Sequence, residues 1–397
     1  MSSTDSYYSS LEFSSDSFSD ISRSVLAHSA PGSDDADFLA NAFDQLETGS
    51  PSAGFQFNPV DDLWFHNIEN VVLQAEDHFF RVPPTLFFAK SSVFSDIYHK
   101  RDVSSTSFFT YAYHGNDPKI IEQLGAPGCT IIKMLGVTAV EAATFLSALI
   151  DPEYFEGPPA RETLEFILAI FKLASKYEVR FLRRRALAHL ERVYPCSDID
   201  DWDRREDFST FSIERQEFHC HPVSSTLTGT LNIIELCTAY NVPWILPTAF
   251  YECCLYDMKT LLAHPKWKDC PGSLPNDIKT RIICGYLAHK EESSRVLAFL
   301  HTDLPHCENE QVCSNIRRVE LRKLCTVREQ PREMQDFLGK VWDMSDWDEF
   351  VSQGMCNSCL SCCKALHRAF RQVSWDNLPA MYGLPNWDKL RAQRQAL

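Results

Sequence analysis

The residues best suited to bind a metal ion are four cysteines toward the C-terminal end of the chain. Cys356 and Cys359 form a C-x-x-C pair, whose spacing lets both sulfurs approach one ion at about 2.3 Å. Cys307 and Cys313, separated by five residues just before a predicted helix, could supply a second pair. Four thiolates are the ligands of a structural zinc site. The spacing therefore predicts a zinc ion that joins the two ends of the terminal helical region.

Neighbouring residues leave other interpretations of these cysteines open. The run CNSCLSCC is crowded, and Cys362, Cys363 and His367 are competing ligands. Because His367 follows Cys363 by four residues on a predicted helix, those two side chains would share a face. The cysteines could also be ordinary reduced thiols or redox groups, although the C-x-x-C does not open a helix in a βαβ unit as redox motifs do. A closed four-thiolate site has no open coordination position, so the zinc interpretation indicates structure and not catalysis.

The sequence contains none of the common catalytic motifs. The patterns G-x-x-x-x-G-K-S/T, G-x-G-x-x-G, G-x-S-x-G and H-E-x-x-H do not occur. His219 and His221 lie in a polar stretch where exposed imidazoles are the default, and Asp151-Pro-Glu153 is typical of a turn after a helix. We therefore expect a protein that is not an enzyme. A site of unrecognised pattern would need a deep pocket with converging titratable groups.

Charge and composition limit the classes of partner. The chain has 397 residues and a net charge of −16, whereas binding to phosphates requires a basic face. The arginine-rich run at 180–185, continued by Arg192, lies on a predicted helix with an apolar face, so we interpret it as a solvated surface. No signal peptide or membrane-spanning run is found, which predicts a cytoplasmic or nuclear protein whose 15 cysteines are reduced. We expect no direct binding to nucleic acid and none to membranes.

Composition divides the chain into four parts. Residues 1–58 are acidic and rich in Ser, which predicts a disordered tail. Residues 59–195 carry strand and helix patterns, interrupted at 99–129 by an insertion or long loop. Residues 196–227 are predicted to be a polar linker, and residues 228–397 a helical region that contains the cysteines. The expected fold class is α+β, in which helices with a small mixed sheet are followed by an all-α region.

The stretch at 62–98 is the most informative one for the fold. Its apolar runs predict two strands on either side of a polar turn at 74–78. From Thr85 onward apolar residues recur at helical spacing as far as Ile97, which predicts a buried helix. Further elements are predicted at 130–135 (a strand), 138–150 (a helix) and 161–193 (a closing helical pair).

This order of elements resembles the start of a BTB/POZ domain, whose usual pattern is an acidic residue, a strand, a hairpin and then F-x-V-H-x-x-x-L-A-x-x-S-x-V-F. The matching residues are Asp62, Phe80, Val82, Ser91, Val93 and Phe94. Four positions depart from the pattern: Pro83 replaces the common His, Pro84 the frequent Lys or Arg, and Phe87 and Phe88 the Leu-Ala pair. The resemblance covers roughly residues 58–390 and extends to segments of the BTB proteins that mushroom-forming fungi carry in large numbers.

The resemblance implies a protein–protein interaction adaptor or scaffold. Its partner would be a second copy of the domain in a homodimer, a cullin ubiquitin-ligase scaffold, or a transcriptional co-regulator. The interaction residues implied are Asp62, Phe80, Val82, Phe87, Val93 and Phe94. In many BTB dimers a basic residue helps to line a charged pocket, and Pro84 replaces that residue here. The 99–129 insertion occupies the place where a cullin would bind. The alternative is a transcription regulator whose acidic tail binds a partner through one helical face, formed by Phe38, Leu39, Ala42, Phe43 and Leu46.

Overall fold

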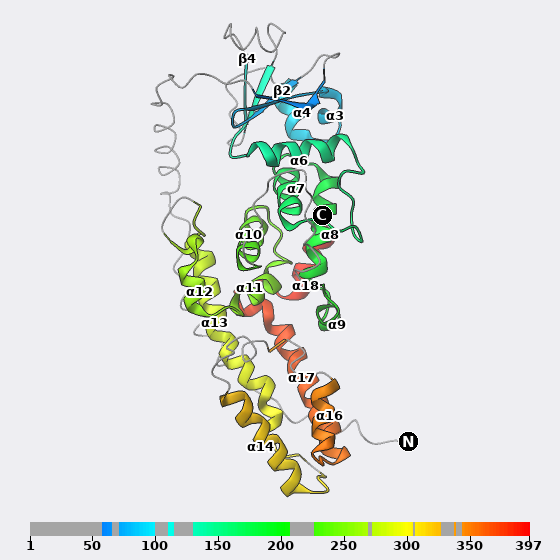
Figure 1. The fold of residues 1–397 in the computed structure, drawn as a ribbon, viewed down its shortest axis with the longest axis vertical. Helices are drawn as coiled ribbons and strands as arrows, with labels where there is room; N and C mark the ends of the chain where they lie inside the picture. Colours follow the sequence, from blue (N-terminus) through cyan, green and yellow to red (C-terminus); the bar gives the residue numbers. More distant parts are fainter. Residues whose placement is uncertain are drawn as a thin grey trace. The chain divides into compact units, whose positions relative to one another are not determined.

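The computed structural model of the chain describes residues 58–65, 71–99, 110–114, 130–206, 226–268, 272–304, 306–326, 337–338 and 344–397. The predictions for the tail, for most of the 99–129 insertion and for residues 207–225 of the linker lie outside these residues. The described residues form a small mixed sheet followed by helices, which confirms the expected α+β class (Figure 1).

The sheet has the strand order β1-β3-β2-β5-β4. Its strands are β1 (Asn58–Trp64), β2 (Val71–Ala75), β3 (His78–Val82), β4 (Thr110–His114) and β5 (Thr130–Met134). β2 and β3 form an antiparallel hairpin in which Val71 pairs with Val82 and Ala75 with His78. β1 and β5 join this hairpin in parallel, one on each side. The two predicted strands and the turn between them are confirmed, because local alternation and a polar turn are sufficient to define a hairpin.

β4 lies inside the region that the sequence predicted to be an insertion or loop. It pairs antiparallel with β5, from Thr110 opposite Met134 to His114 opposite Thr130. The segment TYAYH has the aromatic and β-branched residues that strands favour. A five-residue segment with three such residues and no hairpin partner next to it is also typical of a loop, so only its pairing with β5 identifies it as an edge strand.

The helix predicted from Thr85 to Ile97 is two helices, α3 (Pro84–Phe88) and α4 (Ser92–His99). Ser91 stands at the break. Its Oγ accepts a hydrogen bond from the N–H of Phe94 at 3.2 Å and donates one to the carbonyl of Tyr177 at 2.5 Å. A serine at this position satisfies a free N–H at the start of the second helix. The helical spacing of apolar residues continues across the break, so periodicity alone does not detect it.

α6 (Ala139–Ile150), α7 (Leu164–Lys176) and α8 (Arg180–Val193) confirm the predicted helices of this part of the chain. Arginines of α8 are anchored to carbonyl groups of neighbouring segments. Arg183 donates to the carbonyl of Tyr240 at 2.9 Å, and Arg185 donates to those of Pro152 and Phe155 at 2.9 and 2.8 Å. Part of the basic run therefore fixes loops to the helix.

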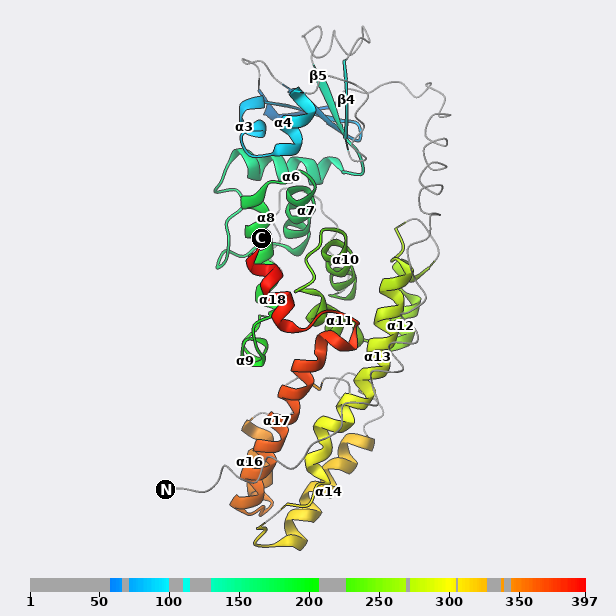
Figure 2. The same cartoon turned by 180° about the vertical axis from the view of Figure 1, so that it is seen from behind.

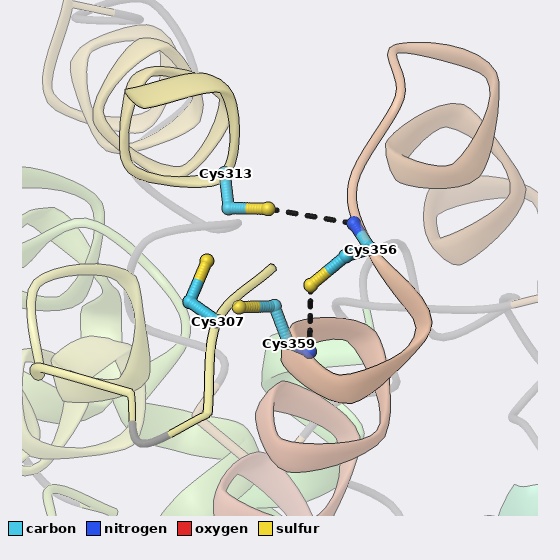
Figure 3. A group of neighbouring side chains, drawn as sticks. All are labelled: Cys307, Cys313, Cys356 and Cys359. Atoms are coloured by element: carbon cyan, nitrogen blue, oxygen red, sulfur yellow. Dashed lines mark hydrogen bonds between the residues drawn. The ribbon is translucent and has the colours of Figure 1, made fainter. Parts of the chain in front are cut away.

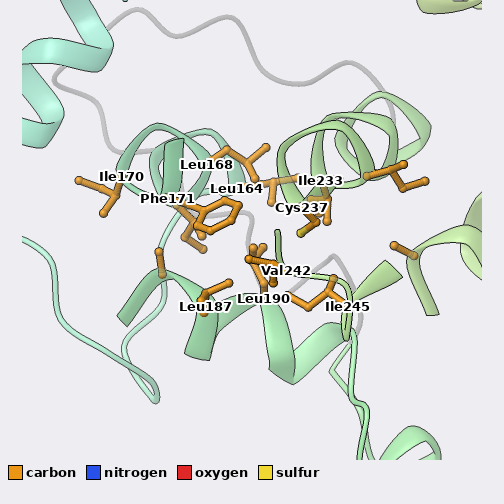
Figure 4. Close-up of a cluster of buried hydrophobic side chains, with 14 of the residues drawn as sticks. Leu164, Leu168, Ile170, Phe171, Leu187, Leu190, Ile233, Cys237, Val242 and Ile245 are labelled. Carbon is orange, nitrogen blue, oxygen red and sulfur yellow. The ribbon is translucent and has the colours of Figure 1, made fainter. Parts of the chain in front are cut away.

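One core joins these helices to the region that follows. The next helices are α9 (Ile199–Asp203), α10 (Thr226–Ala239) and α11 (Leu246–Cys254). Apolar side chains from both sides of the predicted boundary pack together (Figure 4): Leu164, Leu168, Phe171, Leu187, Leu190, Ile233, Cys237, Val242 and Ile245. Within the predicted linker, α9 places Trp202 in the same core. The described residues belong to one compact unit, Phe57–Leu397, so this boundary does not divide the core.

The remaining elements are α12 (Met258–Ala263), η3 (Pro265–Trp267), α13 (Asn276–Val296), η4 (Leu297–Leu300), α14 (Glu310–Thr326), α16 (Met344–Ser352), α17 (Asn357–Met381) and α18 (Trp387–Gln395). α13 and α17 pack against each other, as both views of the chain show (Figure 2). None of the described helices has the length and apolarity that a bilayer span requires.

Replacing Gly285 by alanine is expected to destabilise the crossing of α13 and α17. A Cβ atom at Gly285 would lie 2.1 Å from Cε1 and 2.7 Å from Cδ1 of Tyr382, whose ring is buried and stacks on Phe250. Overpacking of this kind costs about 1–3 kcal/mol in free energy of unfolding. Urea denaturation would measure it, with Gly157→Ala as the matched control, since a Cβ there meets only Arg185 at 3.8 Å. A more stable Gly285→Ala variant would contradict this close approach.

His289 makes the stability of the same crossing depend on pH. Its Nε2 lies 2.6 Å from Oη of Tyr382, and burial lowers the pKa of its imidazole to about 3. In the unfolded chain the pKa is about 6.5, so between pH 6.5 and 3 the unfolded state binds a proton that the folded state does not. Through His289 alone, the free energy of unfolding should therefore fall by up to about 1.4 kcal/mol per pH unit as the pH decreases through this window.

Urea denaturation of the full chain at pH 7.5, 6 and 5 would measure this slope. His289→Gln, which cannot take up the proton, should flatten it by about one proton equivalent. His301→Gln alters an exposed histidine and serves as the control. Equal slopes in the wild type and in His289→Gln would show that His289 does not set the pH dependence.

Candidate metal centre

The four cysteines predicted to form a metal site come together in the structure. Cys307 precedes α14 and Cys313 lies in its first turn, while Cys356 caps the N-terminus of α17 and Cys359 lies in the first turn of that helix. The four Sγ atoms are all within 4.8 Å of one another (Figure 3). Sulfurs bound at about 2.3 Å to one tetrahedral ion would be about 3.8 Å apart. Small inward movements would therefore bring all four to binding distance. We call these four residues the cysteine cluster.

Backbone amides point at the sulfurs of the cysteine cluster. The N–H of Cys356 donates to Sγ of Cys313, and the N–H of Cys359 donates to Sγ of Cys356, both at 3.4 Å. Gly354, with a φ of 92°, ends the turn after α16 and lets the chain reverse toward Cys356. N–H···S hydrogen bonds orient thiolate ligands and stabilise their negative charge. The turn at Gly354 and the first turn of α17 therefore direct the sulfurs of Cys356 and Cys359 toward the same point.

The thiols of the cluster differ in acidity. The N–H groups of Cys359 and Glu308 lower the pKa of Cys356 to about 6, which favours its thiolate form. Burial raises the pKa of Cys313 and of Cys359. A divalent ion among the sulfurs would supply the positive charge that the buried thiols need in order to ionise, because a coordinated thiol is deprotonated by its metal.

Around the cysteine cluster lies a small hydrophobic core, separate from the large core of the chain. We call it the end core. Its buried members among the described residues are Phe299, Leu300, Cys313, Ile316, Trp347, Phe350, Met355, Cys359 and Cys363. These nine side chains come from a segment of 65 residues, a size at which one hydrophobic core rarely supplies more than about 3–5 kcal/mol. Two of the cluster cysteines, Cys313 and Cys359, are themselves part of this core.

The competing ligands named from the sequence lie outside the cysteine cluster. Cys362 is half-buried, and Cys363 is buried in the end core. The ring of His367 packs 5.5 Å from that of Phe299 and 6.0 Å from that of Trp347, and its burial lowers the pKa of the imidazole to about 4. Cys363 and His367 share the buried face of α17, as their spacing predicted, but they serve there as core residues.

The C-x-x-C pair does open a helix, since Cys356 caps α17. The element before it is α16, and not a strand. The arrangement is therefore not the βαβ unit in which redox C-x-x-C motifs occur, as the sequence indicated.

The six residues implied as interaction residues are mostly core residues. Phe80, Val82, Phe87 and Phe94 are buried, and Phe94 stacks on Tyr177 with ring centroids 4.4 Å apart. Val93 is half-buried, and Asp62 is exposed. Five of the six therefore hold the sheet and its helices together, and Asp62 is the member of the set that is presented to solvent.

Charged side chains line two of the surface hollows of the described residues. One of about 520 Å³ lies beside α8, α9 and α18, and six of its charged side chains form three pairs: Arg192 with Glu206, Arg204 with Asp201, and Arg394 with Glu191. The other, of about 590 Å³, lies between α4 and the start of α8. The paired charges of the first hollow are an ion-pair network of the structural kind.

No family model, curated protein or solved structure matches this chain. The resemblance to BTB/POZ domains therefore rests on the residues and the order of elements given above. The geometry of the cysteine cluster is the observation on which the chemistry of the site depends.

Proposed function

We propose that this chain is a non-enzymatic scaffold for protein–protein interaction, whose helical region is held together at one end by a structural zinc ion. The observation that carries the proposal is the convergence of four sulfurs from two separate segments within 4.8 Å. Each pair begins a helix, so one ion would fix the start of α14 against the start of α17. Four thiolates complete a tetrahedral shell, so such a site supports an architecture and leaves no position for a substrate.

Zinc is the ion that best suits the cluster. Soft thiolate ligands favour zinc over magnesium or calcium, and zinc accepts the tetrahedral geometry without a ligand-field preference. The proposed compartment is the cytoplasm or the nucleus, because thiols stay reduced there. The ion would reinforce the end core, which buries nine described side chains. A small core of this kind commonly needs a metal or a disulfide to be stable.

The proposed interaction module is the sheet with α3, α4, α6, α7 and α8, which we take to be of the BTB/POZ type. Support comes from the β2–β3 hairpin, the helices that follow it and the matching residues in their cores. The proposed partner is a protein: a second copy of this chain in the first place, and a cullin scaffold as the alternative. Asp62, exposed on β1, is the matching residue placed to contact it.

Size-exclusion chromatography with light scattering and metal analysis on the same sample would test both parts. We expect one zinc ion per chain in the wild type, none in the double variant Cys356→Ser, Cys359→Ser, and one in the control Cys362→Ser, which alters a half-buried thiol outside the cluster. Equal zinc in all three proteins would refute the assignment of ligands.

The same chromatogram reports the scaffold function. A mass of two chains would support self-association, and Asp62→Arg should then shift it toward one chain. Recovery of a cullin at stoichiometric amounts on the immobilised full chain would support the alternative partner. A single-chain mass together with no stoichiometric protein partner would contradict the scaffold proposal, whatever the zinc content.

A further inference from the structure

The sulfurs of the cysteine cluster differ in their access to solvent. Cys307 and Cys356 are half-buried, whereas Cys313 and Cys359 are buried in the end core. The two accessible sulfurs come from different segments: Cys307 from the stretch before α14, and Cys356 from the N-cap of α17. Each segment therefore contributes one partly exposed cysteine and one buried cysteine to the cluster.

The accessible pair is also close enough to form a bond. Their Sγ atoms lie within the 4.8 Å that spans the cluster, and the sulfurs of a disulfide are about 2.05 Å apart, so they need to approach by less than about 3 Å. Figure 3 shows Cys307 on a loop that faces the cluster, while Cys313 and Cys359 lie on helices. Neither member of the accessible pair lies inside a helix, since Cys356 is the extended N-cap residue before α17.

We infer that the metal centre is a redox-sensitive clasp, in which a hydroperoxide oxidises Cys307 and Cys356 to a disulfide and the zinc ion leaves. This inference rests on the zinc site proposed above. The accessible thiolate attacks the peroxide, the O–O bond breaks, and the sulfur becomes a sulfenic acid, while hydroxide or alkoxide leaves and takes up a proton as water or alcohol. The second thiolate attacks that sulfur, the S–S bond forms, and hydroxide leaves and takes up a proton as water. The peroxide receives the two electrons that the two sulfurs lose.

The exchange replaces one cross-link by another. Zinc keeps only the two buried ligands and dissociates, while the new bond still ties the start of α14 to the start of α17. Reduction by a dithiol returns two electrons, regenerates both thiolates and allows zinc to bind again. The starts of α14 and α17 therefore stay linked in both states, by the zinc ion in one and by the disulfide in the other.

The test uses the zinc-loaded full chain treated with hydrogen peroxide. Zinc release is followed with a chromogenic chelator, and the cysteines are mapped by alkylation and mass spectrometry. We expect one zinc released per chain in step with a Cys307–Cys356 disulfide, and recovery of zinc binding after dithiothreitol. Cys284→Ser removes an exposed thiol on α13, away from the cluster, and should leave the release unchanged.

A further variant separates the accessible pair from the cluster as a whole. Cys307→His keeps a zinc ligand but cannot form the disulfide, and should slow peroxide-driven release by roughly ten-fold or more. Zinc that stays bound in excess peroxide, or that leaves with a different disulfide, would overturn the clasp and leave the zinc site intact. A protein that holds no zinc before peroxide is added would overturn both.

Discussion

Removing the proposed zinc ion with a chelator, or replacing Cys359 by serine, is expected to unfold the helices around the cysteine cluster while the sheet and its helices stay folded. Zinc binding to a four-ligand site contributes on the order of 10 kcal/mol of apparent folding free energy. The end core, with nine buried residues, contributes much less. Without the ion, the buried Cys313 and Cys359 lose their ligand role and the starts of α14 and α17 are no longer joined.

Hydrogen exchange measured on the full chain, with and without chelator, would show this effect. Amides of α14, α16 and the first turns of α17 should lose protection, whereas those of α6, α7 and α8 should keep theirs, because the latter belong to the large core. Cys362→Ser is the matched control on the same helix and should behave as the wild type does. Unchanged protection of α14 in the metal-free protein would mean that the end core is stable without a metal.

Replacing Trp202 by alanine is expected to cost about 3–5 kcal/mol in free energy of unfolding, the usual range for truncating a buried tryptophan. Trp202 is completely buried, packs edge-on against Tyr251 with ring centroids 5.3 Å apart, and lies 6.1 Å from the ring of Trp375. Its indole N–H donates to the carbonyl of Leu338 at 3.2 Å. This one side chain therefore contacts three segments of the helical region.

Urea denaturation followed by circular dichroism would measure the loss. Trp202→Phe should lose less than Trp202→Ala, since it keeps an aromatic ring in the site, and Asp200→Ala, at an exposed position of the same short helix, should change stability little. A loss below about 1 kcal/mol for Trp202→Ala would mean that α9 behaves as the linker that the sequence predicted.

The contrast at Trp202 shows where the sequence is informative. The stretch at 196–227 is polar and weakly patterned, so composition predicted a linker, although a five-residue helix capped by Asp198 lies within it. Burial of Trp202 depends on Tyr251, Leu338 and Trp375, which are far away in the sequence. No local period reports such a contact.

The sequence by itself determined the elements whose signals are local. The β2–β3 hairpin, α6, the pair α7 and α8, and the choice of the four cysteines follow from alternation, helical period and ligand spacing. Each of these signals depends on residues that are close in the chain, with one exception. The two cysteine pairs are far apart in the sequence, and they were assigned to one site because a tetrahedral zinc ion needs four ligands.

Only the tertiary structure decided the features that depend on distant neighbours. β4 is a strand because β5 lies beside it, α3 and α4 separate where Ser91 reaches Tyr177, and Gly285 is required where the ring of Tyr382 crosses α13. The difference between the accessible and the buried sulfurs of the cysteine cluster has the same origin. Spacing shows which sulfurs can reach one ion, whereas the side chains packed around them decide which of those sulfurs solvent can reach.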